Sequence, residues 1–136
     1  MFETFDHTAD IGLRVFAETL EELFVDAARG LTSLLVENVG DVRPTLTETI
    51  QLAGTEIDYL LFDWLNELLF RFETNRLLCC DFNVRLSDRG LEATIRGETC
   101  DELRHRLVHE VKAITYHGLS VQHTQSGWQT ELILDI

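Results

Sequence analysis

Three ionisable side chains crowd the entry to an apolar segment near the start of the chain. Asp6, His7 and Asp10 lie within five residues of one another, and the alternating segment 11–17 follows them directly. Charged groups beside a segment that must be buried are costly unless a cation or a partner pairs them. Local hydrogen bonds offer a second interpretation, because Thr8 and the aspartates can form Asx- or ST-type turns. Residues 6–10 are therefore either a cation or partner site or a polar turn.

The far end of the chain has a second pair of anionic groups. The apolar stretch ELILDI ends at Asp135 and at the terminal carboxylate of Ile136. If this end packs beside Asp10, three carboxylates meet, which is tolerable only around a cation. Donor sets made only of oxygen favour hard ions such as Ca²⁺, Mg²⁺ or Mn²⁺ over Zn²⁺. Without that packing, the same residues form a frayed, charged terminus.

The only lysine of the protein, Lys112, stands in the stretch KAITYHGL, just before a predicted strand. A lysine is usually solvated, and that is one interpretation of Lys112. The other is that its ammonium lies near the carboxylates, where an opposite charge stabilises their ionised form.

These candidate residues must be positioned by strands and helices that the hydrophobic spacing predicts. Apolar residues recur every three or four positions over 19–38, where Thr19 precedes Glu22 at the capping-box spacing. The segments 56–75 and 99–112 also have helical spacing. Alternating residues predict strands at 11–17 and 45–52, and hairpins formed by 77–86 with 91–96 and by 114–124 with 128–136.

His105 and His109 stand four apart in the predicted helix 99–112. They are either two metal ligands without a third ligand nearby in the sequence or part of a solvated helix face beside Glu110. The second interpretation is the simpler one.

This order of elements predicts an α+β fold. We expect residues 1–136 to form a single compact domain, with a largely antiparallel β-sheet and two to three packed helices. A parallel, doubly wound sheet is the weaker alternative, because Gly-rich loops that cradle phosphates are missing.

Composition narrows the classes of partner. The chain has 136 residues, with 11 Lys and Arg against 24 Asp and Glu, so its formal net charge is −13. Such a body repels phosphate backbones and anionic membranes, and we expect no autonomous nucleic-acid binding. No apolar run approaches the roughly 20 residues that span a bilayer. Its three cysteines, two of them adjacent, indicate small core residues in a reducing compartment and a cytoplasmic protein.

Four stretches resemble motifs of the archease family: DHTADIGL (6–13), LLFDWLNELLF (60–70), VKAITYHGL (111–119) and the terminal LDI (134–136). The resemblance implies an archease-like fold and a non-catalytic activator of an RtcB-type RNA ligase. That activator promotes the ligase's histidine–GMP intermediate, gives multiple turnover and broadens nucleotide use, in tRNA splicing or RNA repair.

The resemblance also implies a set of site residues. The family's metal site maps onto Asp10, Asp135 and the carboxylate of Ile136, with Ca²⁺ as the ion and Mn²⁺ or Mg²⁺ as alternatives. Lys112 maps onto the family's functional lysine, and we include His7 and Asp6 among the residues for ligase activation.

Two other functions stay open. A metal-dependent hydrolase could use Asp6, His7 and Asp10, with His7 as base and an ion-bound water as nucleophile. A general chaperone or RNA-binding modifier is the third candidate, and the charge disfavours its RNA-binding version.

Overall fold

The computed structural model describes residues 1–7 and 10–136, and at His7 it describes the backbone alone. The elements, in chain order, are β1 (Phe2–His7), β2 (Asp10–Ala17), α1 (Leu20–Leu35), the 3-10 turn η1 (Val39–Asp41), β3 (Leu46–Ala53), α2 (Ile57–Asn75), β4 (Leu77–Ser87), β5 (Gly90–Thr99), β6 (Ala113–Thr115), β7 (Val121–Thr124) and β8 (Gly127–Asp135).

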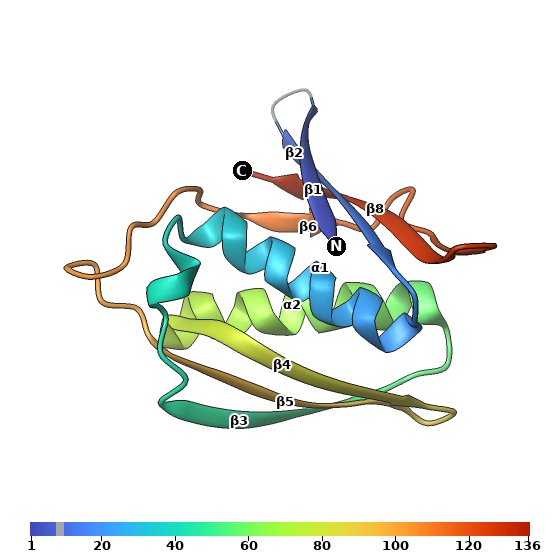
Figure 1. The fold of residues 1–136 in the computed structure, drawn as a ribbon, viewed down its shortest axis with the longest axis horizontal. Coiled ribbons are helices and arrows are strands. Elements are labelled where there is room, and N and C mark those ends of the chain that lie inside the picture. The colour runs from blue at the N-terminus through green and yellow to red at the C-terminus, as the bar shows by residue number, and fades with distance from the viewer. Residues whose placement is uncertain (8–9) are drawn as a thin grey trace.

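The strands form two sheets, and both α-helices lie between them (Figure 1). The five-stranded sheet has the order β1-β2-β8-β6, with β7 also paired to β8, and the three-stranded sheet has the order β3-β5-β4. Every strand pairing in the described part of the chain is antiparallel. The α+β prediction is confirmed, and the parallel, doubly wound alternative is wrong.

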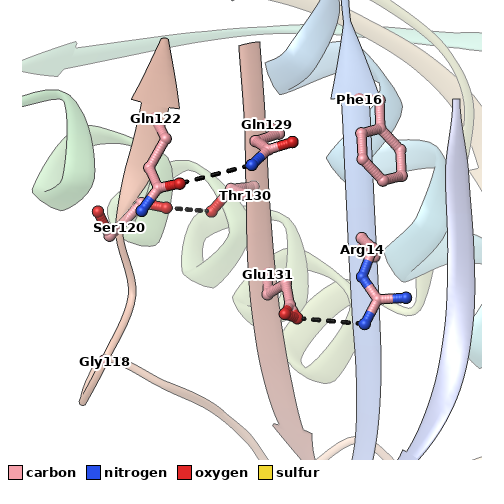
Figure 2. A pocket seen from close by; sticks show the side chains of 8 residues that line it. All are labelled: Arg14, Phe16, Gly118, Ser120, Gln122, Gln129, Thr130 and Glu131. Carbon is pink, nitrogen blue, oxygen red and sulfur yellow. Dashed lines mark hydrogen bonds and ion pairs between the residues drawn. The ribbon is translucent and has the colours of Figure 1, made fainter. Parts of the chain in front are cut away.

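Residue alternation gives the five-stranded sheet one buried face and one outer face. Leu13 on β2 and its partner Leu132 on β8 are buried on the face that the helices cover. The next residues along these strands, Arg14 and Glu131, lie on the outer face, away from the helices (Figure 2). A side chain's position along β2 or β8 therefore decides whether it meets the core or the surroundings.

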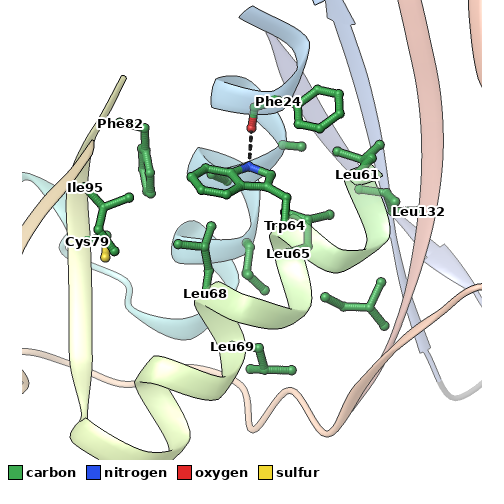
Figure 3. Packing of buried hydrophobic residues seen from close by; sticks show 14 of the residues in the cluster. Phe24, Leu61, Trp64, Leu65, Leu68, Leu69, Cys79, Phe82, Ile95 and Leu132 are labelled. Carbon is green, nitrogen blue, oxygen red and sulfur yellow. Dashed lines mark hydrogen bonds between the residues drawn. The ribbon is translucent and has the colours of Figure 1, made fainter. Parts of the chain in front are cut away.

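The core is centred on Trp64 of α2, whose side chain is fully buried (Figure 3). Its indole Nε1 donates a hydrogen bond of 2.9 Å to the carbonyl oxygen of Phe24 on α1, so the buried polar atom is satisfied and the helices are linked. The ring of Phe82, from β4, meets Trp64 edge to face. No helix in the described residues is long and apolar enough to cross a membrane.

The two long predicted helices are confirmed with small changes at their ends. α1 begins where the capping box predicts it, since the Thr19 hydroxyl accepts a hydrogen bond of 3.2 Å from the Glu22 amide. The predicted strands 11–17 and 45–52 correspond to β2 and β3, and the first predicted hairpin to β4 and β5. The second hairpin is confirmed in part: β7 and β8 form it, while β6 is a separate short strand on β8. β1 was not predicted.

The predicted helix at 99–112 is wrong. This segment is made of turns and extended backbone that runs past the C-terminal end of α1. The amides of Val108 and His109 donate hydrogen bonds of 3.0 and 3.1 Å to the carbonyls of Leu35 and Leu34. The last carbonyls of a helix lack partners within the helix. Because the amides of Val108 and His109 donate to these carbonyls, they cannot form the hydrogen bonds of a helix at 99–112.

A buried ion-pair network fixes the same segment. The His105 ring is almost fully buried, and both interpretations of the His105–His109 pair are wrong. Its Nδ1 accepts a hydrogen bond of 2.9 Å from the Asp101 amide, and its Nε2 lies 3.1 Å from the Glu98 carboxylate. Because Nδ1 accepts, the proton of a neutral ring sits on Nε2 and is donated to Glu98. His105 is therefore a structural residue.

Candidate functional site

The strand register brings the two predicted metal-binding aspartates together. Asp10, the first residue of β2, is the direct cross-strand partner of Asp135, the last residue of β8. Ala113 of β6 is the partner of Asp135 on its other side. Two segments more than one hundred positions apart in the sequence thus end at the same edge of the sheet.

Both aspartates point to the outer face of this sheet. Leu132 and Leu134 are buried against the helices, so the alternation of β8 turns Asp135 outward, where it is exposed. The same alternation on β2, with Leu13 buried, turns Asp10 to that face, where it is half-buried. Directly opposed residues in an antiparallel pair have Cβ atoms about 4.5–5.5 Å apart, and like charges there are destabilising without a counter-charge.

Lys112 joins this group through its backbone. Its amide donates a hydrogen bond of 2.7 Å to the carbonyl oxygen of Asp135, which fixes the start of β6 beside the end of β8. The Lys112 side chain is exposed, and its ammonium forms no ion pair with a described residue. The structure thus places the main chain of Lys112 beside Asp135, and the predicted proximity of its ammonium to the carboxylates stays a prediction.

Ile136 follows Asp135 and packs its half-buried side chain against the core. This contact holds position 136 at the end of β8, next to the aspartates. Among the described residues, no group of three or more His, Cys, Asp and Glu could hold a metal ion. A cation held by Asp10 and Asp135 would therefore need another oxygen donor, and the Ile136 carboxylate is of that chemical class.

Asp6 and Asp10 do not share a face. On β1, Asp6 is paired with Ile11 and His7 with Asp10. Directly opposed residues lie on the same face of a sheet, so Asp6 is on the inner face with Ile11 and not on the outer face with Asp10. The Asp6 side chain is exposed, because β1 and β2 extend beyond the helices at this end (Figure 1). The side chain of His7, like residues 8–9, lies outside the described residues. The hydrolase interpretation requires all three side chains around one ion, and this register does not favour it.

A second feature of the outer face was not predicted from the sequence. A shallow pocket of about 310 Å³ lies further along β2 and β8 and is lined by polar groups (Figure 2). Its Arg14 guanidinium is already paired with Glu3 at 2.9 Å and with Glu131 at 3.4 Å. The hydrogen bond that Arg14 donates to the Glu3 carboxylate raises the pKa of Arg14, and desolvation offsets part of this rise. An arginine whose positive charge is already paired with two carboxylates is poorly suited to bind an anion.

The cysteines lie in or against the core. Cys79 is buried, Cys80 and Cys100 are half-buried, and all three are free thiols. Burial raises the pKa of the Cys79 thiol to about 12, so its reactive thiolate is scarce near neutral pH. This agrees with their interpretation as small apolar core residues.

The chain is similar to known proteins over nearly its whole length. Residues 2–136 match the Archease protein family (MTH1598/TM1083). The chain belongs to the archease family. "Protein archease" of Methanopyrus kandleri is 37% identical over 139 residues, with 99% of each chain covered. "Protein archease" of Pyrococcus furiosus is 34% identical over 140 residues, covering 99% of this chain and 98% of that one.

Solved structures of similar proteins share the fold. The solution structure of Methanobacterium thermoautotrophicum protein 1598 is 31% identical and covers 99% of this chain and 98% of its own, with a TM-score of 0.83. A Thermotoga maritima archease, described as a "possible chaperone", matches with a TM-score of 0.68 at 20% identity, covering 100% of this chain and 98% of its own. The latter likeness is evidence for the archease fold alone.

Proposed function

We propose that this protein is a non-catalytic activator of an RtcB-type RNA ligase in tRNA splicing or RNA repair. It promotes formation of the ligase's histidine–GMP intermediate, allows multiple turnover and broadens nucleotide use. Membership of the archease family supports this proposal. The observation on the molecule that favours it most is the cross-strand pairing of Asp10 with Asp135, beside the start of β6 at Lys112.

The proposal includes a divalent cation held by Asp10, Asp135 and the carboxylate of Ile136. A donor set made only of oxygen suits hard divalent cations, and Ca²⁺ is the ion that the family resemblance implies, with Mn²⁺ and Mg²⁺ as alternatives. When bound, the ion would offset the repulsion between the two directly opposed carboxylates. The chain's own residues would then present an outward-facing oxygen cluster, with the main chain of Lys112 beside it.

The charge of the molecule supports a protein partner of this kind. A net charge of −13 disfavours direct contact with RNA and favours contact with a basic protein surface. An enzyme that binds RNA must itself neutralise phosphates with Lys and Arg. Complementary charge of this kind accelerates encounter between two proteins and orients them.

The test is ligation under multiple-turnover conditions, with an RtcB-type ligase from the same genome, GTP and Mn²⁺. We expect several ligations per ligase only when this protein is present. We expect Asp10→Asn and Asp135→Asn to reduce the yield to that of ligase alone. Asp88→Asn, an exposed turn residue on the opposite sheet, is the matched control and should stimulate like the wild type.

Two results would contradict different parts of the proposal. Absence of stimulation by the wild-type protein would reject the activator function itself. Full stimulation by both aspartate variants would reject the metal mechanism and leave the activator function in place.

A further inference from the structure

Aromatic side chains are exposed along one side of α2, a helix that otherwise buries its large apolar residues. Tyr59 is 55% exposed and Phe70 is 57% exposed. Phe62, half-buried, lies between them at helical spacing, so the three share one face of α2. Tyr116, directly after β6, is 37% exposed and packs on the same face. We call these four residues the aromatic ridge.

Three of the four rings of the aromatic ridge, those of Tyr59, Phe62 and Tyr116, contact one another. Tyr59 and Tyr116 stack with ring centroids 4.8 Å apart and planes inclined by 10°. Phe62 meets Tyr116 edge to face at 5.2 Å. The Val121 amide donates a hydrogen bond of 2.8 Å to Asp58, which ties the segment after Tyr116 to α2. Rings ordered before binding lose little conformational freedom when a partner covers them.

Carboxylates border the aromatic ridge. Glu56, Asp63 and Glu73 are exposed on α2 or immediately before it. None of the three has an ion-pair partner among the described residues, whereas Glu67 on the same helix is paired with Arg71 at 2.9 Å. Exposed aromatic side chains with a charged rim are typical of a protein interaction site. The partner that complements it has an apolar groove bordered by arginine and lysine.

We propose that the aromatic ridge is the docking surface for the basic face of the RNA ligase. The identity of this partner rests on the proposed function. The position of Tyr116 supports it: Tyr116 lies three residues beyond Ala113, the cross-strand partner of Asp135, or about 10 Å along an extended chain. The aspartates face the outer side of the sheet, so a partner seated on the aromatic ridge reaches them by extending around the edge of the sheet at β6.

A second copy of this chain fits the ridge less well. In a two-fold symmetric dimer the same patch faces itself, so the bordering carboxylates of the two copies would meet. Like charges across an interface cost several kcal/mol. The acidic rim thus favours a basic partner.

The first test measures the affinity of the full chain for the ligase by biolayer interferometry. We expect Tyr59→Ala with Phe70→Ala to raise Kd by at least about tenfold, as for exposed aromatic anchors at the centre of an interface. Leu103→Ala is the matched control, because Leu103 is 96% exposed in the 99–112 segment, and its Kd should equal that of the wild type. The melting temperature of Leu103→Ala should equal that of the wild type, and that of the double variant should fall only slightly, because Tyr59→Ala removes the stacking on Tyr116.

The second test keeps the rings and alters the rim. We expect Asp63→Lys with Glu73→Lys to slow association and to weaken its dependence on salt, while Asp88→Lys has a smaller effect.

Each outcome separates this inference from the proposed function. If the wild type stimulates ligation and the ridge variants bind the ligase like the wild type, the docking inference is wrong and the activator function stands. If the wild type neither binds nor stimulates the ligase, both are wrong. If the free chain sediments as a dimer that Phe70→Ala dissociates, the ridge holds a second copy and the ligase assignment is overturned.

Discussion

Glu98 shows how one buried carboxylate organises a segment without secondary structure. Its oxygens accept hydrogen bonds from the Arg43 amide at 2.6 Å, from the Arg104 guanidinium and from His105. Burial alone would raise the pKa of this carboxyl, but these hydrogen bonds outweigh it and lower the pKa below its usual value. The carboxylate thereby joins the end of β5 to the segment before β3 and to the turn at 101–105.

This geometry predicts a pH-dependent contribution of Glu98 to stability. A carboxyl with a lowered pKa in the folded state stabilises it above the unfolded pKa, about 4.3, and loses that contribution as pH falls through the lower folded value. We expect Glu98→Gln to reduce the free energy of unfolding by about 1–3 kcal/mol at pH 7. The difference from the wild type should narrow steadily below about pH 4.3, as measured by urea denaturation across pH.

Glu73→Gln is the control for this titration, because Glu73 is exposed and has no described hydrogen bond or ion pair. It should follow the wild type at every pH. A difference between Glu98→Gln and the wild type that stays constant down to pH 3 would contradict a lowered pKa for Glu98.

At the scale of elements, the three-stranded sheet depends on a close approach at a β-bulge. The register of β4 against β5 shifts between Cys79 and Asp81, and Gly97 is the partner of Cys79 at this point. A Cβ built on Gly97 would overlap the Leu78 carbonyl oxygen and lie 2.7 Å from the Cys79 Cα. Backbone atoms cannot move aside as the end of a side chain can.

We therefore expect Gly97→Ala to lower the free energy of unfolding by about 2–3 kcal/mol, because β4 and β5 must separate locally. Thermal or urea denaturation measures this change. Gly40→Ala is the matched control, since a Cβ at Gly40 meets nothing within 4 Å, and it should leave stability nearly unchanged. Equal stability of the two variants would show that the bulge can relax.

The elements that could be predicted from the sequence are those whose capping residues and hydrophobic spacing lie within one short segment. α1 has a capping box at Thr19 and a continuous buried face, and both can be recognised without knowing what packs there. β1 could not be predicted because its two phenylalanines are three positions apart and so lie on opposite faces of the sheet. Phe2 packs against the core, whereas Phe5 covers Gly12 on the outer face. The alternation that predicts a strand is thus absent from β1.

Long-range contacts explain both why the helix predicted at 99–112 is wrong and why the candidate site could be predicted only in part. The helical signals of 99–112 are real, but Glu98 and the last carbonyls of α1 satisfy its polar groups in another conformation. The meeting of Asp10 with Asp135 could be stated only as a condition, since cross-strand pairing between the two ends of a chain leaves no local signal. The aromatic ridge could not be predicted from the sequence, because Tyr116 lies far from α2 along the chain and meets Tyr59 only in the folded protein.

The charge of the whole molecule makes cation binding measurable without a ligase. The chain has a net charge of −13, so any salt that screens repulsion should raise its melting temperature. A specific ion must therefore be compared with NaCl at the same ionic strength. The proposed site adds a selective effect: Ca²⁺ at ten times its Kd stabilises the folded state by about 1.4 kcal/mol. For a chain of this length that is a rise of about 4 °C in Tm.

We expect this extra rise in the wild type and in Asp88→Asn, but not in Asp10→Asn or Asp135→Asn. Adding Gly-Ser after Ile136 converts the proposed carboxylate ligand into a neutral peptide carbonyl, which binds a cation more weakly, so the extra rise should shrink. If the extended chain keeps the full rise, Ile136 is not a ligand and the aspartate pair still is. If Ca²⁺ and NaCl act equally on the wild type, the metal site is wrong, whatever the protein does to the ligase.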